Sequence, residues 1–486
     1  MARNHISGAV SLLLLVLVCL AQSGCKKSVE GEPEVAPFDS SRPIEINEFL
    51  PKSGGGNTKI VIKGKNFGTD KELLDLKIGG KEAVVISVKG NSMFAIVPPK
   101  AYSGKIELTI TERSGSQSAV AADKFEYARR MVVSTLCGER DEKGNYDVKN
   151  GPFDDCGGIA EPTWFSFDPK HPDILYLAQD NFKKMRVLDL KARWIDMGVP
   201  NGIAGIERMR TIAWTLSGDT MLIANDRGGD LDPNILFIPR SKEHPVGKDA
   251  FLQPEVMMQG KQCNGVAVHP VNGEAYYNSY AMGDFFRFEY AKARRQDGTF
   301  DMTQREKLFN IQDIHWEYVT VIHPSGRYAY ITVINQHYIL RTDYNWQTKR
   351  FGTPYVVCGM AQQAGYADGV GASARLSTPY QGVFVKNEQY VEENREDVYD
   401  YYFCDRYNHC IRKLSPDGNV TTYAGRGSAA LNPNPYGLVN GALRTEARFD
   451  QPCALAYDEK RQAFYIGDVA NHVIRMISYE MDDEEE

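Results

Sequence analysis

The sequence predicts an all-β protein with two folded parts, a small β-sandwich followed by a larger ring of repeated sheets. Three observations support this prediction: short runs of alternating apolar and polar residues, glycine and proline between those runs, and a succession of motifs that recurs after residue 130. The chain has 486 residues with 43 Gly, 23 Pro and 26 Tyr, a composition typical of many short strands joined by turns. Its length favours at least two folded units.

The overall composition excludes several classes of protein. Hydrophobic residues make up 42% and charged residues 24% of the chain, which excludes long disorder and a polytopic membrane protein. The formal net charge is -7, so the surface has no general attraction for phosphate backbones. We therefore expect no nucleic-acid partner.

The N-terminus carries the pattern of an export signal. Arg3 precedes an apolar run over residues 9–21, which is too short to span a bilayer comfortably and is typical of a secretory signal peptide. The small residues before Cys25 resemble a bacterial lipoprotein signal, which implies a signal peptide over residues 1–24 and lipidation of Cys25. An ordinary signal peptide with an incidental Cys25 is the alternative. Residues 25–42 are polar and lack periodicity, and we interpret them as a flexible tether.

Residues 43–128 predict a sandwich of roughly seven strands, because period-two runs alternate with turn residues. The segment resembles an IPT/TIG domain, which has an immunoglobulin-like fold. The resemblance rests on Gly54-Gly55-Gly56, Ile62-Lys63-Gly64-Lys65-Asn66-Phe67-Gly68 and Phe125-Glu126-Tyr127. We expect Phe67 to anchor a loop in the core and both Gly64 and Gly68 to take positive φ. The resemblance implies a spacer or protein-contact module.

The motifs that recur after residue 130 include a β run ending in Gly, a Gly-rich loop, an apolar strand after Pro, and a second strand closing on Asp. The last two copies contain the runs 403–412 (FCDRYNHCIR) and 466–475 (IGDVANHVIR). These residues resemble NHL repeats, each of which forms one four-stranded blade of a β-propeller. Repeat starts fall at residues 162, 209, 263, 317, 380 and 452, which gives six blades.

The ends of the repeat array predict how the ring closes. The last repeat stops near Tyr479 after three strands, whereas an unaccompanied strand over residues 131–136 precedes the first repeat. Pairing this strand with the last blade would remove two exposed sheet edges. We therefore predict a six-bladed NHL-type β-propeller over residues 131–480, followed by an acidic tail over residues 481–486.

The aligned repeats place a set of side chains at the mouth of the propeller channel. The candidate ligand-binding residues are Trp164, Arg210, Asn264, Glu317, Tyr318, Tyr380 and Gln381. Aromatic rings pack on the apolar faces of sugars, and amides and carboxylates bind hydroxyls, so a polar ligand such as a glycan is expected. The turn residues Asp405, Asn408, Asp468 and Asn471 are expected instead to cap their own hairpins.

Two weaker candidate sites lie elsewhere. Asp226, Asp230 and Asp232 could bind Ca²⁺ through oxygen ligands, although a solvated loop is the favoured interpretation. Apart from this Ca²⁺, we expect no cofactor. Cys404 and Cys410 flank one hairpin, and an exported location would permit a disulfide between them.

The order of the domains resembles that of Bacteroidetes surface lipoproteins, which often accompany outer-membrane glycan-uptake systems. The resemblance implies a lipid-anchored, surface-exposed outer-membrane protein that binds a glycan or other polar ligand without catalysis, beside an outer-membrane transport complex. Two alternatives remain open. Related propellers include metal-dependent lactone hydrolases and lyases, for which Glu317 and Asn264 could serve as ligands here. A scaffold that grips a partner protein is the other alternative.

Overall fold

The computed structural model describes residues 36–113, 115–199, 205–279, 283–311 and 317–480. The expected signal peptide, the lipidation site Cys25 and the acidic tail therefore lie outside the described residues. Two compact units divide the chain, Met1–Ala128 and Arg129–Glu486. Across the described ranges, no helix combines the length and the apolar character needed to cross a membrane.

The first unit is a sandwich of two β-sheets, with strand orders β1-β3-β6 and β2-β8-β7-β4-β5. The strands are β1 (Glu45–Leu50), β2 (Ser53–Gly54), β3 (Lys59–Gly68), β4 (Leu74–Ile78), β5 (Lys81–Glu82), β6 (Val84–Ile96), β7 (Gly104–Glu112) and β8 (Gly115–Tyr127), with the 3-10 helix η1 (Lys71–Leu73) before β4. Apolar side chains from the two inner faces meet in one core, as the alternating sequence runs require.

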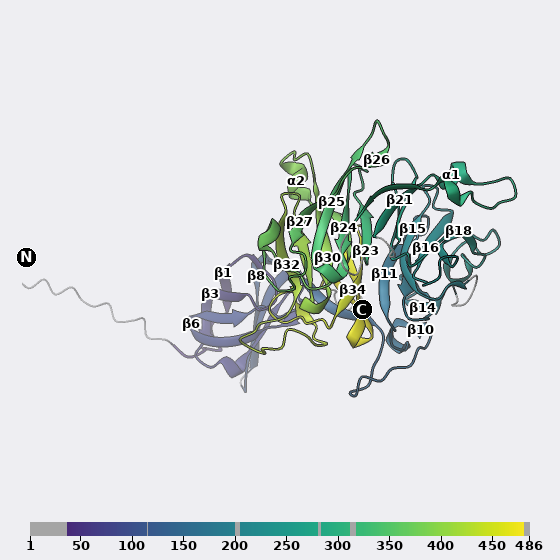
Figure 1. Ribbon diagram of the computed structural model, residues 1–486. Helices are drawn as coiled ribbons and strands as arrows, with labels where there is room; N and C mark the ends of the chain where they lie inside the picture. Colours follow the sequence, from purple (N-terminus) through teal and green to yellow (C-terminus); the bar gives the residue numbers. More distant parts are fainter. Residues whose placement is uncertain (1–35, 114, 200–204, 280–282, 312–316, 481–486) are drawn as a thin grey trace, which may run out of the picture. The chain divides into compact units, whose positions relative to one another are not determined.

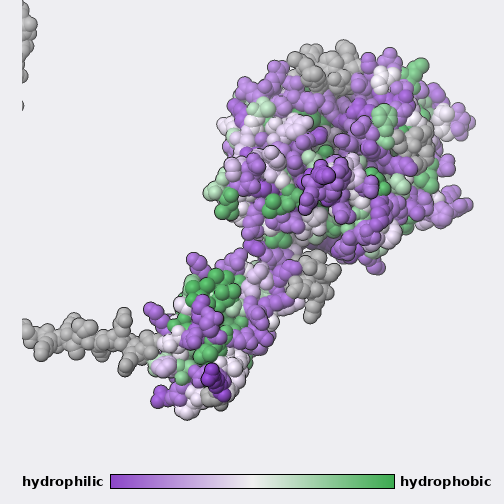
Figure 2. Space-filling view, turned by 90° about the horizontal axis from the view of Figure 1, so that it is seen from below, coloured by the Kyte–Doolittle hydropathy of each residue, from purple (hydrophilic) through white to green (hydrophobic). Residues whose placement is uncertain are grey.

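Phe67 is buried in that core, as predicted. Gly68 takes a φ of +76°, also as predicted, but Gly64 lies within β3 and does not have positive φ. Glycine is needed at position 64 for a different reason, because a Cβ there would clash with the Glu45 carbonyl oxygen and the Phe67 ring. Figure 2 shows hydrophobic residues gathered on one face of this unit.

The second unit is a six-bladed β-propeller (Figure 1), whose described residues form six antiparallel sheets in chain order. The inner strands are β11 (Pro162–Phe167), β15 (Met209–Trp214), β19 (Val266–Val268), β23 (Tyr318–Ile322), β29 (Pro379–Lys386) and β34 (Pro452–Asp458). Each inner strand contacts those of the neighbouring blades, and β34 returns to β11. This circle of contacts confirms the predicted ring.

The remaining strands complete each blade outward from the centre. The second strands are β12 (Ile174–Gln179), β16 (Thr220–Asn225), β20 (Ala275–Ser279), β24 (Tyr328–Val333), β30 (Tyr399–Asp405) and β35 (Ala463–Asp468). The third strands are β13 (Arg186–Asp189), β17 (Pro233–Pro239), β21 (Asp284–Phe288), β25 (Tyr338–Asn345), β31 (Cys410–Leu414) and β36 (Val473–Tyr479). The outer strands are β14 (Trp194–Met197), β18 (Glu255–Gln259), β22 (Glu306–Asn310), β27 (Tyr355–Gly359), β32 (Asn419–Gly425) and β9 (Met131–Cys137).

Short elements occupy the edges and connections of the propeller. The short strands are β10 (Gly151–Pro152), β26 (Arg350–Phe351), β28 (Gly369–Val370) and β33 (Gly441–Ala442), and the α-helices are α1 (Tyr290–Ala293) and α2 (Glu388–Glu392). The 3-10 helices are η2 (Phe153–Asp155), η4 (Gly247–Asp249), η5 (Met302–Gln304), η6 (Ile334–Gln336), η7 (Gly371–Ser373), η8 (Arg406–Asn408) and η9 (Val469–Asn471).

The sixth blade closes the ring with a strand from before the first blade, as predicted. Strand β9 pairs antiparallel with β36, with Met131 opposite Tyr479 and Val133 opposite Ile477. Sheet order β33-β9-β36-β35-β34 therefore joins the beginning of the propeller sequence to its end. The pairing covers an edge of β36 that would otherwise be open.

The turns of blades 5 and 6 are held by the same internal network. The Asp405 carboxylate accepts hydrogen bonds from the Ser377 amide at 2.7 Å, from Asn408 Nδ2 at 2.8 Å and from Arg412 Nη1 at 2.8 Å. In blade 6 the Asp468 carboxylate accepts equivalent bonds from Asp450, Asn471 and Arg475. These contacts confirm that the turn residues cap their own hairpins.

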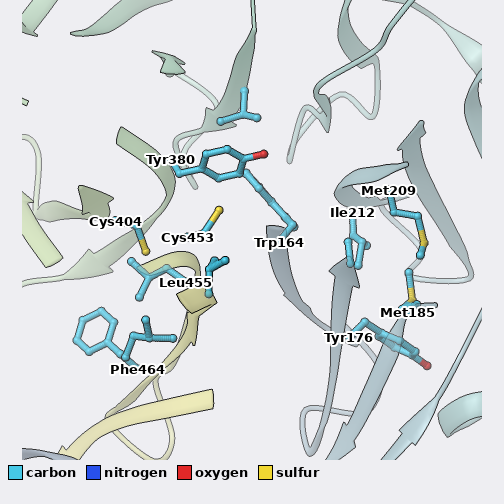
Figure 3. Packing of buried hydrophobic residues seen from close by; sticks show 14 of the residues in the cluster. Trp164, Tyr176, Met185, Met209, Ile212, Tyr380, Cys404, Cys453, Leu455 and Phe464 are labelled. Carbon is cyan, nitrogen blue, oxygen red and sulfur yellow. The ribbon is translucent and has the colours of Figure 1, made fainter. Parts of the chain in front are cut away.

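The proposed disulfide between Cys404 and Cys410 is wrong in this structure, where both thiols are free. Cys404 lies opposite Ile411, and Cys410 lies opposite Asp405. Because successive side chains of a strand point to opposite faces, the two thiols project from opposite faces of the blade. Cys404 packs in the cluster that contains Cys453 and Leu455 (Figure 3).

Candidate functional site

A cavity of about 240 Å³ lies at the end of the propeller where the inner strands begin. Four of its lining residues are each the second residue of an inner strand: Thr163, Arg210, Tyr380 and Cys453. The inner strands surround one axis and run in the same direction, so equivalent positions face the same end of the ring. Repetition of the blade therefore builds this part of the cavity.

A second set of equivalent positions lines the same cavity. Asp180, Ile334, Arg406 and Val469 each directly follow the second strand of a blade. The turn at this point brings the chain back toward the channel mouth. The repeat therefore fixes where these side chains lie, while the sequence of each blade decides whether that position is acidic, basic or apolar.

Arg210 is the centre of an ion-pair network in the cavity wall. Its Nη1 lies 2.6 Å from Asp180 Oδ2 and 3.6 Å from Asp226 Oδ2, and its Nη2 pairs with Glu317 Oε1. The Arg210 residue is only 5% exposed, so its guanidinium is committed to these carboxylates. Asn335 Nδ2 in turn donates a 2.8 Å hydrogen bond to Glu317 Oε2.

Arg208 extends this network from the residue before β15. Its Nε donates to Asp180 Oδ1 at 2.8 Å, and its Nη1 lies 3.0 Å from Asp226 Oδ2. Two guanidinium groups thus hold Asp180 and Asp226 in fixed positions. Asp226 Oδ1 is buried and accepts no hydrogen bond within the described part of the chain.

The local charges shift the pKa values of the network in different directions. Burial acts to raise the pKa of Asp180, but hydrogen bonds from Arg208 and the charge of Arg210 lower it overall. For Asp226, burial outweighs the same two arginines, and its pKa is raised. Burial also raises the pKa of Tyr380 to about 12, against the opposing charge of Arg210. The cavity therefore keeps an ionised Asp180 beside a neutral phenol.

Three of the residues predicted from the sequence meet at this cavity, namely Arg210, Glu317 and Tyr380. Glu317 precedes β23, and Tyr380 forms part of the apolar floor together with Cys453. Their ligand-binding role stays a prediction.

The other four predicted residues are buried in the blades and do not line the cavity. Trp164 packs in the hydrophobic cluster that includes Tyr380 (Figure 3). Gln381 Oε1 accepts hydrogen bonds from Phe165 N at 2.8 Å and from Leu455 N at 2.9 Å. Gln381 Nε2 donates a 2.8 Å hydrogen bond to the Phe165 carbonyl oxygen. Asn264 is bonded to Asn278, and the Tyr318 hydroxyl donates to the Gly283 and Asp284 carbonyls.

Several cavity residues were missed by the sequence reasoning, including Glu161, Thr378, Arg406 and Tyr407. Glu161, Glu317 and Thr378 share one position, directly before an inner strand. Arg406 shares its position with Asp180. The signal that could have found them is the repeat alignment itself, extended by one residue on either side of the strands.

The loop considered for Ca²⁺ has its carboxylates engaged elsewhere. Asp226 pairs with Arg208 and Arg210, whereas Asp232 lies 3.3 Å from Arg227 Nε. Asp230 is exposed. In the part of the chain that the structure describes, no three acidic, histidine or cysteine side chains are grouped in a way that could hold a metal ion. Of the two residues suggested as metal ligands for a hydrolase, Glu317 lines the cavity and Asn264 does not.

Sequence comparison assigns both parts of the chain. Residues 43–127 match the model of the IPT/TIG domain. A 117-residue segment is 31% identical to NHL repeat-containing protein 2 of Bos taurus and 30% identical to the Homo sapiens protein. The segment covers 24% of this chain and 14% of each of those proteins, so the likeness extends over a small part of their length.

Three solved structures from Bacteroides match nearly the whole chain. One from Bacteroides thetaiotaomicron, described as an auxiliary nutrient binding protein, is 42% identical with a TM-score of 0.80, and the match covers 92% of this chain and 100% of that one. One from Bacteroides ovatus with the same description is 36% identical, with a TM-score of 0.71 and coverage of 92% and 100%.

The third, also from Bacteroides thetaiotaomicron, is described as a suspected phosphatase. It is 38% identical, with a TM-score of 0.82, and the match covers 93% of this chain and 100% of that one. The identity over full-length matches leads to one assignment. The chain, which has an IPT/TIG domain before a six-bladed β-propeller with NHL-type repeats, belongs to the family of these Bacteroides proteins.

Proposed function

We propose that the protein binds a small, uncharged, hydroxyl-rich ligand, such as the terminal unit of a glycan, in the cavity around Arg210, Arg406 and Tyr407. In this proposal it acts without catalysis, as an accessory to nutrient uptake at the cell envelope. The observation that carries the proposal is a cavity whose wall offers fixed hydrogen-bond acceptors and donors beside aromatic rings.

The charges in the cavity wall favour an uncharged ligand over an anionic one. Three carboxylates line the cavity, from Glu161, Asp180 and Glu317, against two guanidinium groups, from Arg210 and Arg406. Arg210 is already paired with acidic side chains, so it has little capacity left for an anion. Carboxylates accept hydrogen bonds from hydroxyl groups, whereas they repel phosphate and other anions.

The size and rim of the cavity fit one sugar unit better than a long chain. Its volume of about 240 Å³ lies below the roughly 300 Å³ at which ordinary small-molecule sites begin. Tyr407 is 52% exposed, and the Arg406 guanidinium lies over its ring at 5.4 Å from the centroid, so the exposed part of the ring is what could pack against a sugar. The half-buried Arg406 side chain lines the cavity, and its guanidinium, which donates from Nη2 to Gln451 Oε1 at 3.3 Å, has further N–H groups that could donate to a ligand.

The relatives support the accessory role and the location. Two members of the family are described as auxiliary nutrient binding proteins. The N-terminal pattern ending at Cys25 supports export and lipid anchoring in the outer membrane, beside a transport complex. Replacement of Cys25 by Ser should then release the protein from the membrane fraction. Retention of the Cys25→Ser protein in that fraction would contradict lipid anchoring.

The binding proposal is tested by titrating the full chain with a panel of polysaccharides and their oligosaccharides by calorimetry. We expect Arg406→Ala and Tyr407→Ala each to weaken binding tenfold or more. Tyr355→Ala is the matched control, because Tyr355 is 50% exposed but lies on β27, away from the cavity lining. Failure of every glycan to bind, or equal affinity of all three variants, would overturn the proposal.

The structure also shows which variants make poor probes of binding. Arg210→Ala would leave Glu317 without its cationic partner and Asp180 and Asp226 with Arg208 alone, and Trp164→Ala would open a void in the propeller core. Loss of binding in either variant could therefore reflect unfolding.

The hydrolase or lyase alternative has its own readout. Turnover of a phosphate ester or lactone by the full chain, lost in Glu317→Gln with the thermal stability kept, would favour an enzyme. The scaffold alternative would be favoured by capture of a partner that survives Arg406→Ala and Tyr407→Ala.

A further inference from the structure

A second pocket lies at the opposite end of the propeller strands from the channel cavity, where blades 5 and 6 meet. Its volume is about 270 Å³, similar to the 240 Å³ of the channel cavity. Val385 and Tyr457 line it, and each is the last residue but one of an inner strand, whereas the channel cavity lies where the inner strands begin. The described residues that line the two pockets do not overlap, so this pocket is a separate site.

Aromatic rings from both blades form the wall of this pocket. Tyr402 of β30 and Tyr423 of β32 belong to blade 5, and their ring centroids lie 4.8 Å apart. The ring of Phe464 in blade 6 lies 4.9 Å from Tyr402 and 5.7 Å from Tyr423. Tyr457, also of blade 6, lies 4.7 Å from Phe464. Three tyrosines therefore surround one phenylalanine at the boundary of the two blades.

The three tyrosines carry hydroxyl groups that the protein does not use. The hydroxyls of Tyr402, Tyr423 and Tyr457 make no hydrogen bond to any residue that the structure describes. All three side chains are partly exposed. Burial raises the pKa of Tyr423 to about 12, so its phenol stays neutral and can both donate and accept a hydrogen bond. The pocket thus combines aromatic rings with three hydroxyls available to a ligand.

Tyr423 reaches the pocket because of an irregularity in its strand. In β32, Ala424 pairs with Ile411 and Thr422 pairs with Arg412, so Tyr423 between them is the extra residue of a β-bulge. Such a bulge changes the direction of a side chain. The same bulge recurs in four other blades, where the extra residue is apolar and has no hydroxyl: Met257, Leu308, Val357 and Leu136. Blade 5 therefore departs from those copies at the position that faces this pocket.

The charged side chains that line the pocket are already paired within the protein. Asp400 is 1% exposed and accepts a 2.8 Å hydrogen bond from Asn387 Nδ2. Lys386 Nζ lies 3.3 Å from Glu388 Oε1. Gln462 is exposed at the rim, and its side-chain amide is both a donor and an acceptor. The pocket therefore favours a neutral, hydroxyl-bearing ligand over an ion.

A neighbouring hollow continues the aromatic wall toward blade 1. Tyr457 also lines this hollow, which has a volume of about 510 Å³ and includes Phe167 and Pro172. Phe167 is the last residue of β11, and β11 contacts β34, the strand that carries Tyr457. A ligand that extends from the pocket past Tyr457 therefore meets a second set of apolar side chains. This arrangement fits a chain of several units.

From the three tyrosine hydroxyls that no described residue bonds, and from the tyrosine at the bulge of β32, we infer that this pocket is a second binding site, for a neutral glycan chain. Sugar rings offer apolar faces to aromatic side chains and hydroxyls to phenols and amides. One sugar unit occupies the pocket beside Tyr402 and Tyr423, and the next passes Tyr457 toward Phe167. The inference does not rest on the proposed function, because it uses no residue of the channel cavity.

The test is calorimetric titration of the full chain with neutral polysaccharides and their oligosaccharides. Tyr423→Leu should weaken binding about tenfold, and Tyr423→Phe, which removes only the hydroxyl, about threefold. Leucine already occupies the equivalent bulge at Leu136 and Leu308, so the melting temperature of Tyr423→Leu should stay close to that of the wild type. Tyr355→Leu is the matched control on another outer strand, and it should leave the affinity unchanged.

The two sites are told apart by the Arg406→Ala variant, which alters the channel cavity alone. A glycan that binds Arg406→Ala with undiminished affinity but binds Tyr423→Leu weakly supports the second site. If every glycan that binds were sensitive to Arg406→Ala and insensitive to Tyr423→Leu, the second site would be overturned and the proposed function would stand. Failure of all glycans to bind would overturn both.

The length of the ligand provides a further measurement. In Arg406→Ala, an oligosaccharide should bind at least several-fold more tightly than its single sugar unit, because the chain also contacts the hollow beyond Tyr457. Equal affinity of the single unit and the oligosaccharide would contradict the binding of a chain at this end of the propeller.

Discussion

Blades 5 and 6 carry the same buried arginine as blade 1, but they give it a different partner. Arg412 and Arg475 each contact a fully buried aspartate, Asp405 at 2.8 Å and Asp468 at 3.1 Å. Arg186 in blade 1 has Gln179 at the corresponding position. Its Nη2 donates a hydrogen bond to the Lys149 carbonyl oxygen, and its charge interacts electrostatically with Cys156. The arginine is therefore present in all three blades, whereas the aspartate of blades 5 and 6 is replaced by Gln179 in blade 1.

The difference shows what a repeated scaffold leaves free to vary. In blades 5 and 6 the aspartate, asparagine and arginine satisfy one another, so the network holds the hairpin and leaves no reactive group. In blade 1 the charge of the equivalent Arg186 helps to lower the pKa of the Cys156 thiol. A buried group that its own blade does not satisfy marks a place where the blade interacts with something outside the repeat.

The largest expected effect comes from removing the anion where it is present. Asp468→Ala leaves Arg475 buried without its partner, which should lower the free energy of unfolding by about 3–5 kcal/mol. Gln179→Ala removes a side chain that pairs with no charge, and the loss of its hydrogen bond should cost about 1 kcal/mol. Calorimetry of the propeller transition measures both. Equal losses would mean that the two arginines are held in the same way.

The channel mouth offers a second comparison of equivalent positions. Arg406 and Val469 both follow the second strand of a blade and both line the cavity. Because the Arg406 guanidinium lines the cavity and can donate to a ligand, Arg406→Ala should weaken ligand binding tenfold or more, a difference of about 1.4 kcal/mol. Val469→Ala should change the affinity less than about twofold. Comparable losses in the two variants would indicate that the cavity binds by shape alone.

The fold could be predicted because the motifs that identify a blade lie within a short stretch of the sequence. The aspartate, asparagine and arginine spacing of blades 5 and 6 identified the repeat, and a blade one strand short identified β9 as the strand that closes the ring. Neither inference needs knowledge of distant contacts. The cap role of Asp405 and Asp468 followed from the same local chemistry.

The candidate site could be predicted only in part, because the inner strands are irregular where they begin. The register shifts between Pro162 and Trp164 and between Pro379 and Gly382. Such a bulge changes which residues face the channel, and alternation counted along the sequence does not reveal it. As a result Tyr380, and not Gln381, reaches the cavity, while Trp164 turns into the core.

The packing of Cys137 and Cys156 in one hydrophobic cluster could not be predicted for a different reason. The first residue belongs to the closing strand and the second to an irregular segment that no other blade repeats. Aligned copies therefore carry no information about the path of that segment. Its cluster with Phe153 and Leu188 decides where Cys156 lies.

The smallest expected effect tests whether Arg186 acts on Cys156. Gln179→Asp would give Arg186 the carboxylate that Arg412 and Arg475 already have, and the new ion pair would draw its charge away from the thiolate. In the reduced wild type the alkylation rate of Cys156 should rise with pH around a midpoint near 7, because the thiolate is the reactive form. Gln179→Asp should move that midpoint upward by about one pH unit or less.

The direction of this shift distinguishes the charge of Arg186 from the other groups that face the thiol. Cys137 and the Gly138 amide remain in Gln179→Asp, so they should keep the midpoint below the ordinary thiol value of about 8.5. Cys137→Ala removes the neighbouring thiol, which is the largest cause of the lowered pKa of Cys156, and it should raise the midpoint further than Gln179→Asp does. If Gln179→Asp left the midpoint unchanged, Arg186 would be a structural remnant of the repeat, and Cys137 with Gly138 would account for the acidity of Cys156.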